Sequence, residues 1–189
     1  MIRIGILGDI GSGKSYVAKS FKYPLFNADL EVSKLYKNNK KIFIKLNKSL
    51  PNYIHSFPIN KNEMSKAILA NKSNINKIVK VVHLEVRKKM NSFLKKNKKK
   101  RIIVLDIPLL LENRINKKND ILIFIDSKKS DILRRLKKRK NFNEKLYRKF
   151  QDIQLPLSYK KKKSKFIIKN DFTDKSVKLG IKKILKQIV

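Results

Sequence analysis

The sequence predicts an α/β fold in which a parallel sheet of about five strands is flanked by helices. Short apolar runs of the buried-strand type alternate with stretches of helical periodicity, which is typical of a parallel sheet. A glycine-rich loop follows the first apolar run and precedes a helical stretch, as in a strand–loop–helix phosphate-binding unit. The 189 residues are enough for one domain with a sizeable core.

The glycine-rich loop is the most specific motif of the chain. Four of the five glycines fall between Gly5 and Gly13, and the run from Gly8 to Ser15 completes the pattern Gly-x-x-x-x-Gly-Lys-Ser of a phosphate-binding P-loop. Glycines let backbone N–H groups point at an anion, and the N-terminus of the following helix adds partial positive charge. We therefore expect Lys14 to reach the β- and γ-phosphates of a nucleotide and Ser15 to bind Mg²⁺.

The remaining elements follow from apolar runs and periodicity. After the first strand at 2–7, the predicted strands are residues 24–27, 102–106, 121–125 and 166–168. The predicted helices are residues 29–47, 74–96, 129–138 and 175–188, and residues 49–58 are expected to form a loop. Residues 30–98 are mainly helical and lie between the second and third strands, so we expect them to form an inserted acceptor-binding subdomain. The core then comprises about 1–29 and 101–189.

The net charge of +35 does not by itself predict a nucleic-acid-binding protein. Lysine outnumbers arginine 41 to 8, and asparagine and isoleucine are also abundant, which indicates a drift of the whole composition. Nucleic-acid surfaces use arginine forks and exposed aromatic side chains, and neither is clustered here. We therefore expect no specific nucleic-acid partner. The lysine runs at 98–100 and 160–163 are expected to carry solvated charge at helix ends or in loops.

Other composition features limit the possible sites and locations. The chain has no cysteine and two histidines, so disulfides, thiolate metal sites and histidine clusters are excluded. No apolar run approaches the ~18 residues of a membrane span. We expect a cytoplasmic protein without a membrane partner. The sequence does not determine the oligomeric state, although a monomer is favoured.

Two acidic residues follow predicted strands and are candidates for catalysis. Asp29 comes just after the second strand, where a carboxylate could orient Mg²⁺ or accept the proton of an acceptor hydroxyl. It could equally cap the helix that follows. Asp106 closes the third strand, in the position of a Walker-B acid that contacts Mg²⁺. The alternative for Asp106 is an ordinary polar residue at a strand end.

Basic residues on two predicted helices are candidates for anion binding. Arg134, Arg135 and Arg139 are three of the eight arginines, and they suggest planar recognition of phosphate or adenine, with Arg139 preferred. A solvated helix face is the alternative. His83 and Arg87 lie one helical turn apart and could bind an anionic group of the acceptor. The alternative for His83 is a packed, hydrogen-bonded side chain.

These features favour a small-molecule kinase. A compact chain lacks room for the accessory modules of helicases and transporters, and no guanine-recognition motif of the form Asn/Thr-Lys-x-Asp occurs. Two alternatives stay open at this point. One is a kinase of another nucleotide or small metabolite, and the other is a P-loop ATPase that binds nucleic acid through its lysines.

Nearly the whole chain resembles the bacterial dephospho-CoA kinases, which phosphorylate the ribose 3′-hydroxyl of dephospho-CoA with ATP in the last step of coenzyme A biosynthesis. The matching segments are the P-loop, Asn27-Ala-Asp29, Val82-His83-x-x-Val86-Arg87, Asp106-Ile-Pro-Leu-Leu-Leu-Glu112, Arg139, Gln151, Gln154 and Asn170. The chain departs from the family pattern at Tyr16, Asn27, Leu84, Leu157, Lys160 and Lys165.

The resemblance implies a P-loop kinase fold with a lid at about 139–163, and it implies a set of site residues. The catalytic residues would be Asp29, Lys14 and Arg139. The ATP-binding residues would be Gly8, Gly11, Ser12, Gly13, Lys14, Ser15, Tyr16 and Arg139. The residues that bind dephospho-CoA would be Asp29, His83, Arg87, Pro108, Leu109, Leu110 and Glu112. Mg²⁺ would be held by Ser15 and Asp106.

Overall fold

The computed structural model describes residues 1–140 and 142–189, which form two compact units. The first unit comprises residues 1–27, 97–143 and 150–189, and the second comprises residues 28–96 and 144–149. Residue 141 belongs to the predicted lid and lies outside the described residues. The division of the chain into a core, an acceptor-binding insertion and a lid stays a prediction.

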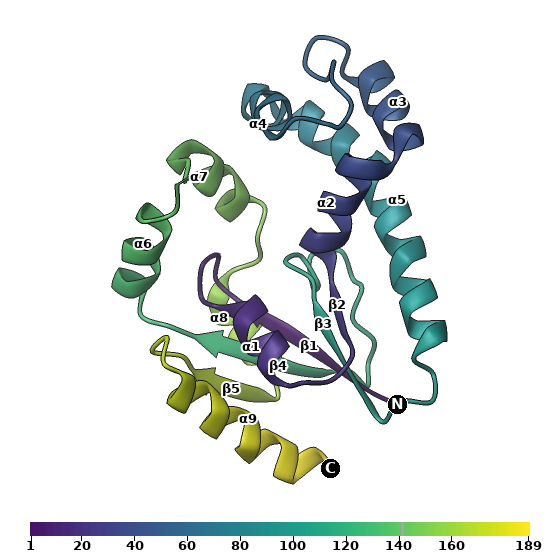
Figure 1. The fold of residues 1–189 in the computed structure, drawn as a ribbon. Coiled ribbons are helices and arrows are strands. Elements are labelled where there is room, and N and C mark those ends of the chain that lie inside the picture. Colours follow the sequence, from purple (N-terminus) through teal and green to yellow (C-terminus); the bar gives the residue numbers. More distant parts are fainter. Residues whose placement is uncertain (141) are drawn as a thin grey trace. The chain divides into compact units, whose positions relative to one another are not determined.

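The first unit is built on a five-stranded parallel sheet (Figure 1). Its strands are β1 (Ile2–Gly8), β2 (Leu25–Asn27), β3 (Ile102–Asp106), β4 (Ile121–Asp126) and β5 (Phe166–Lys169). The strand order is β2-β3-β1-β4-β5, and each neighbouring pair is parallel. The predicted α/β fold with a five-stranded parallel sheet is therefore confirmed. Because β1 is central, the loop that follows it leaves the sheet between the carboxyl ends of β3 and β4.

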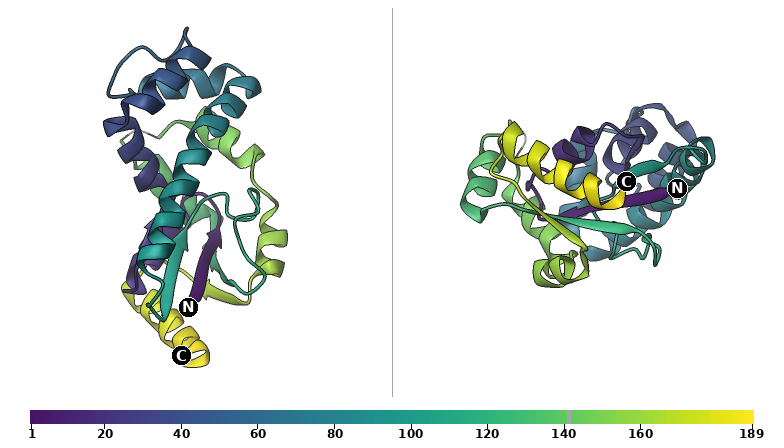
Figure 2. Two further views of the ribbon diagram at one scale, coloured as in Figure 1. Left: turned by 90° about the vertical axis from the view of Figure 1, so that its right-hand side faces the viewer. Right: turned by 90° about the horizontal axis from the view of Figure 1, so that it is seen from below.

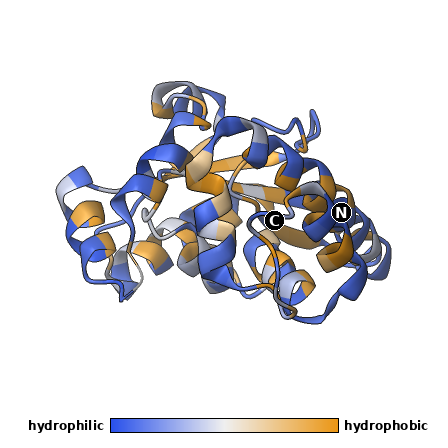
Figure 3. Ribbon diagram, turned by 90° about the horizontal axis from the view of Figure 1, so that it is seen from above, coloured by the Kyte–Doolittle hydropathy of each residue, from blue (hydrophilic) through white to orange (hydrophobic). Residues whose placement is uncertain are grey.

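Helices cover both faces of this sheet. The first unit contains α1 (Lys14–Ser20), α6 (Lys129–Lys137), α8 (Leu157–Lys163) and α9 (Asp174–Ile188). Alternate strand residues such as Ile4, Ile6 and Ile123 pack with α1 and α9 in one fully buried cluster. Figure 2 shows α8 on the opposite face of the sheet from α9. With both faces covered, the strands are mainly apolar rather than alternating, as their largely orange colour in Figure 3 shows.

The second unit has a separate helical core. It contains α2 (Ala28–Asn38), α3 (Lys40–Ser49), α4 (Lys61–Ala70), α5 (Lys72–Lys96) and the first six residues of α7 (Glu144–Asp152). Leu35, Leu46, Ile78 and Val82 belong to one buried apolar cluster. The prediction of one helix over 29–47 is wrong, because the helix breaks at Asn39. The backbone of Asn39 is extended, and its side chain accepts the N–H of Ile42 at 3.1 Å, which caps α3.

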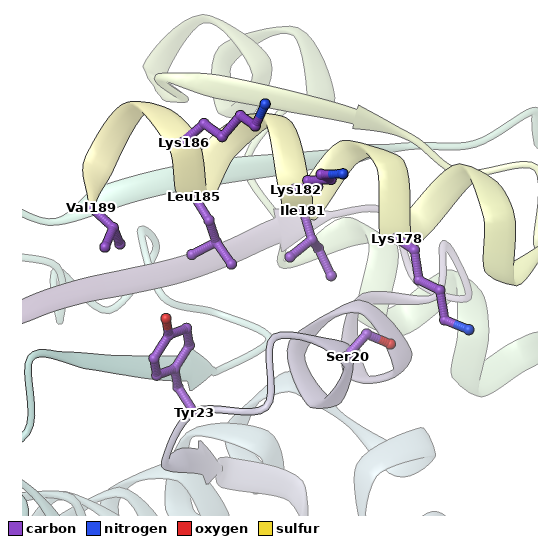
Figure 4. A pocket seen from close by; sticks show the side chains of 8 residues that line it. All are labelled: Ser20, Tyr23, Lys178, Ile181, Lys182, Leu185, Lys186 and Val189. Carbon is purple, nitrogen blue, oxygen red and sulfur yellow. The ribbon is translucent and has the colours of Figure 1, made fainter.

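An open groove of about 540 Å³ runs along α9 (Figure 4). Its lining combines an apolar floor with lysine side chains, and it consists of Ser20, Tyr23, Lys178, Ile181, Lys182, Leu185, Lys186 and Val189. None of these residues belongs to the glycine-rich loop, so this groove is distinct from the expected nucleotide site.

The start of α9 is fixed by hydrogen bonds to Asp171. Its Oδ1 accepts the N–H of Thr173 at 2.9 Å, the hydroxyl of Thr173 at 2.7 Å and the hydroxyl of Ser176 at 2.5 Å. These bonds, led by the one from Ser176, lower the pKa of Asp171 from 3.8 to about 2. The charged carboxylate therefore stabilises the turn between β5 and α9.

We expect the stabilisation by Asp171 to depend on pH. Because the folded pKa is depressed to about 2, the contribution is complete above the unfolded pKa of about 3.9 and is lost as the pH falls through 2. Asp171→Asn should lower the melting temperature at pH 6, and the gap to the wild type should narrow between about pH 4 and 2. Circular dichroism melts measure this gap. An equal gap at pH 6 and pH 2 would contradict the assignment.

Candidate active site

The glycine-rich loop between β1 and α1 has a backbone that only glycine adopts readily. Gly11 has φ 85° and Gly13 has φ 90°. Neighbouring side chains also leave no space for a Cβ: an added Cβ would lie 2.9 Å from Cγ of Leu136 at Gly11 and 2.5 Å from Nδ2 of Asn170 at Gly13. The ammonium of Lys14 donates to the backbone carbonyl of Asp9 at 2.7 Å, so it lies over the loop. The loop is a closely packed cradle of the kind that binds phosphate groups.

Two segments hold the carbonyl of Ser12 in the middle of this loop. Ser12 is only 1% exposed. Its carbonyl accepts the side-chain amide of Asn170 at 2.8 Å and the hydroxyl of Ser127 at 3.1 Å. Ser127 follows β4 and Asn170 follows β5, so the carboxyl ends of both strands anchor the loop.

An aromatic ring and a guanidinium lie beside the loop. The side-chain oxygen of Asn170 accepts the N–H of Phe172 at 2.9 Å. The guanidinium carbon of Arg135, on α6, lies 4.4 Å from the centroid of the Phe172 ring. An added Cβ on Gly13 would lie 3.5 Å from this ring. The planar groups are therefore close to the phosphate loop.

The structure distinguishes the three arginines that the sequence singled out. Arg134 forms an exposed ion pair with Asp131 at 2.8 Å. Arg139, the residue preferred from the sequence, is exposed just beyond the end of α6. Arg135 makes the planar contact instead. Sequence reasoning missed Phe172, although its position just after a parallel strand places it at the edge of the sheet where ligands bind.

Asp106 ends β3 as expected and has a neutral partner. It is 3% exposed, and Asn27 on β2 is its partner in the strand register. The side-chain amide of Asn27 donates to Oδ2 of Asp106 at 2.6 Å. The family that the sequence resembles has an acid at position 27, whereas this chain has the hydrogen-bond donor Asn27. Positions 27 and 106 together therefore carry one carboxylate, that of Asp106.

The residues expected to bind Mg²⁺ could supply only part of its ligands, and the nucleotide phosphates and water would supply the rest. Ser15 is exposed at the start of α1, and Asp106 offers a carboxylate oxygen. Among the described residues, no group of three or more His, Cys, Asp or Glu side chains could hold a metal ion. This donor set suits Mg²⁺, which is often held by one or two protein oxygens together with phosphate oxygens and water.

The segment from Pro108 to Glu112 is fastened to the core of the first unit. Leu110 is fully buried, and an added Cβ on Gly5 of β1 would lie 2.6 Å from its Cδ2. Oε1 of Glu112 lies 2.8 Å from the ammonium of Lys160 and accepts the N–H of Leu155 at 3.0 Å. The side chain of Leu110 therefore contributes to packing, and Glu112 has a protein partner. Binding of dephospho-CoA by this segment stays a prediction.

The expectation that residues 160–163 carry only solvated charge is wrong for Lys160. This lysine is 1% exposed, and its ammonium also donates to the side-chain oxygen of Gln154 at 2.7 Å. The four lysines belong to α8, which packs on the sheet. A buried carboxylate needs a cation nearby, and Lys160 supplies it for Glu112. Composition could not reveal this contact, because its two residues are 48 positions apart.

The remaining candidates include three residues of the second unit. His83 and Arg87 lie one turn apart on α5, and Asp29 is the second residue of α2. Burial, followed by the positive charge of Arg87, lowers the pKa of His83 below 6.5, which favours a neutral imidazole at pH 7. In the first unit, the hydroxyl of Tyr16 contacts the carboxylate of Asp174, which joins α1 to α9.

Comparison with known proteins gives the family of this chain. A sequence model of the dephospho-CoA kinase family matches residues 2–175. The chain belongs to the dephospho-CoA kinase family. A dephospho-CoA kinase of Wolbachia sp. subsp. Brugia malayi is 33% identical over 190 residues, which cover 98% of this chain and 97% of that protein. The family expected from the resemblance is thus confirmed.

Solved structures agree with this fold. A protein of Thermus thermophilus superposes with a TM-score of 0.80 at 22% identity, covering 100% of this chain and 98% of that one. Dephospho-CoA kinase from Campylobacter jejuni gives a TM-score of 0.61 at 22% identity, with 98% and 96% covered. At these identities the likeness concerns the fold alone. No helix in the described part of the chain is long and apolar enough to cross a membrane.

We expect the buried pair between Lys160 and Glu112 to be important for stability. Lys160→Met leaves the Glu112 carboxylate buried without its cation, which should lower the free energy of unfolding by about 3–5 kcal/mol. The exposed Lys162→Met on the same helix is the matched control and should change it by less than about 0.5 kcal/mol. Urea titration measures both. The double variant Glu112→Met/Lys160→Met should recover most of the loss, because it removes the unpaired charge. Equal urea midpoints for the two single variants would contradict this role.

Proposed function

We propose that the chain transfers the γ-phosphoryl group of ATP to the ribose 3′-hydroxyl of dephospho-CoA, with the residues that the sequence singled out. The hydroxyl oxygen forms a bond to the γ-phosphorus, and the bond between that phosphorus and the β–γ bridging oxygen breaks. Its electron pair leaves with ADP, and the hydroxyl proton passes to a carboxylate. The P-loop between β1 and α1 supports ATP as the donor, and membership of the dephospho-CoA kinase family supports the acceptor.

The phosphate groups would be held by the P-loop. Its backbone amides and Lys14 would bind the β- and γ-phosphates. The ammonium of Lys14, which donates to the carbonyls of Gly8 and Asp9, would then donate to phosphate oxygens instead. Ser15 and Asp106 would hold Mg²⁺, which when bound neutralises charge that develops on the phosphates. Arg139 would stabilise the transferring group from the lid. Positioning and electrostatic stabilisation supply most of the catalysis in reactions of this kind.

The base of ATP would stack beside Arg135 and Phe172. The guanidinium carbon of Arg135 lies 4.4 Å from the centroid of the Phe172 ring, and both groups are planar. A purine offers a third planar surface of the same kind, and stacked and cation–π contacts each contribute about 0.5–1.5 kcal/mol. Tyr16, which follows the P-loop directly, is the remaining residue that we assign to nucleotide binding.

We assign three residues of the second unit to binding of the acceptor, namely Asp29, His83 and Arg87. Asp29 is the proposed base, because only Ala28 separates it in the chain from Asn27 at the carboxyl end of β2. Arg87 carries positive charge for a phosphate of dephospho-CoA, and the neutral His83 supplies a hydrogen bond. In the first unit, the segment from Pro108 to Glu112 is a further candidate for acceptor binding. We propose that the enzyme acts as a cytoplasmic monomer and has no specific nucleic-acid partner.

The role of Asp29 predicts a selective loss of turnover. Asp29→Asn keeps a polar oxygen in the first turn of α2 but cannot accept the proton, so kcat with dephospho-CoA should fall about 10²–10⁴-fold. ATP affinity should change little, because the P-loop is untouched. Coupled measurement of ADP release, together with ATP titration by calorimetry, separates the two quantities.

Lys14→Met is the contrasting variant in this experiment, because it should weaken ATP binding as well as turnover. A folded Asp29→Asn protein with nearly normal kcat would leave Asp29 with only a structural role in the first turn of α2. Wild-type protein that hydrolyses ATP only when nucleic acid is added, and not with dephospho-CoA, would instead favour the nucleic-acid-binding ATPase.

Neighbouring arginines allow a matched test of the base site. Arg135→Ala removes the planar contact and should weaken ATP binding about 3- to 10-fold, from a stacking contribution of about 0.5–1.5 kcal/mol. Arg134→Ala removes the same charge from the next position but leaves the contact with Phe172, so ATP affinity should stay within about twofold. Fluorescence titration with a labelled ATP measures both. Equal losses would indicate that only the charge matters.

A further inference from the structure

Asn170 lies at the junction between the phosphate loop and the aromatic ring of Phe172. It follows β5 directly and is 4% exposed. Its amide nitrogen donates to the carbonyl of Ser12 at 2.8 Å, and its amide oxygen accepts the N–H of Phe172 at 2.9 Å. Its own backbone N–H donates to the carbonyl of Asp126, which extends the pairing of β4 and β5. All four groups belong to the first unit.

The bond to Ser12 fixes the direction of a backbone amide in the loop. A trans peptide is planar, and its carbonyl and N–H point in opposite directions. When Asn170 and Ser127 draw the Ser12 carbonyl to one side, the N–H of Gly13 is turned to the other side. Backbone N–H groups that are held in advance bind an anion without a cost of reorganisation.

The bond to Phe172 fixes the ring on the other side of Asn170. Phe172 has φ 67°, a left-handed conformation that is unusual and strained for a bulky residue. The hydrogen bond from its N–H to Asn170 and the contact of its ring with Arg135 maintain this conformation. The backbone strain at Phe172 is therefore opposed by the same side chain that holds the phosphate loop.

We infer that Asn170 is a positioning residue that sets the phosphate-binding amides with its nitrogen and the base-stacking ring with its oxygen. It acts through Ser12 and Phe172 and does not itself need to touch the nucleotide. The inference deepens the proposed function, because it rests on ATP binding at the P-loop. It does not depend on which molecule accepts the phosphoryl group.

Asn170→Leu tests this role, because leucine is neutral and similar in shape but has neither the donor nor the acceptor. Two ligands separate the two halves of the site: inorganic tripolyphosphate reports on the loop, and the ratio of ATP to tripolyphosphate affinity reports on the base. Asn170→Leu should weaken tripolyphosphate about tenfold or more, since it leaves a buried carbonyl with fewer donors. It should also lower the ATP-to-tripolyphosphate ratio about 3- to 10-fold, through the ring.

Asn74→Leu is the matched control. Asn74 is 5% exposed and donates to the carbonyl of Ala67 at 3.1 Å in the second unit, so the same change removes a similar buried hydrogen bond. We expect a comparable loss of melting temperature but affinities for both ligands within about twofold of the wild type. A purely structural role for Asn170 would give this same pattern, and finding it in folded Asn170→Leu would overturn the inference.

Ser127→Ala keeps the test decisive if Asn170→Leu does not fold. It removes only the second donor to the Ser12 carbonyl, so tripolyphosphate and ATP should both weaken by about 3-fold, with their ratio unchanged. Unchanged tripolyphosphate affinity in this variant would overturn the loop half of the inference. Turnover of dephospho-CoA by the wild type is measured separately: its absence, with ATP binding intact, would refute the proposed function and leave the role of Asn170 standing.

Discussion

The position of the Ser12 carbonyl is the constraint on which the nucleotide site depends. The loop can approach Asn170 and Leu136 closely only because Gly13 and Gly11 have no Cβ and adopt positive φ. In return, the ends of β4 and β5 supply the two donors that hold this carbonyl. The order of the strands makes these contacts possible, because β4 pairs directly with β1 on one side and with β5 on the other. The P-loop motif thus provides the glycines, and the order of the strands brings Ser127 and Asn170 to the loop that contains them.

Much of the first unit could be predicted because its signals are local. Strands that are buried on both faces appear in the sequence as apolar runs. The predicted ends of all five strands lie within about two residues of the observed ends. The P-loop was found from its spacing alone. The helix break at Asn39 is also a local signal, since asparagine is a favoured cap, but the apolar periodicity continues across it and concealed the break.

The contacts that complete the site could not be predicted in the same way, because they join distant positions. Asn170 and Ser12 are 158 residues apart, and nothing near either residue reveals the bond. Arg135 and Arg134 are adjacent on α6, and their side chains point in different directions. The side chain of Arg135 reaches the ring of Phe172, whereas that of Arg134 pairs with Asp131. Lys160 is chemically identical to the exposed lysines beside it, so only the fold shows that it neutralises Glu112. The type of each residue indicated what it could bind, but the sequence around it did not indicate its partner.

The neutral residue at position 27 has an electrostatic consequence for the same site. Two carboxylates placed where Asn27 and Asp106 lie, 2.6 Å apart, could not both be ionised, and one would retain a proton. The amide at position 27 instead donates to Oδ2 of Asp106 and so orients its carboxylate. In the proposed function, Asp106 would supply the protein charge that binds Mg²⁺ at this strand edge, and Asp29, two positions after Asn27, would act on the acceptor hydroxyl.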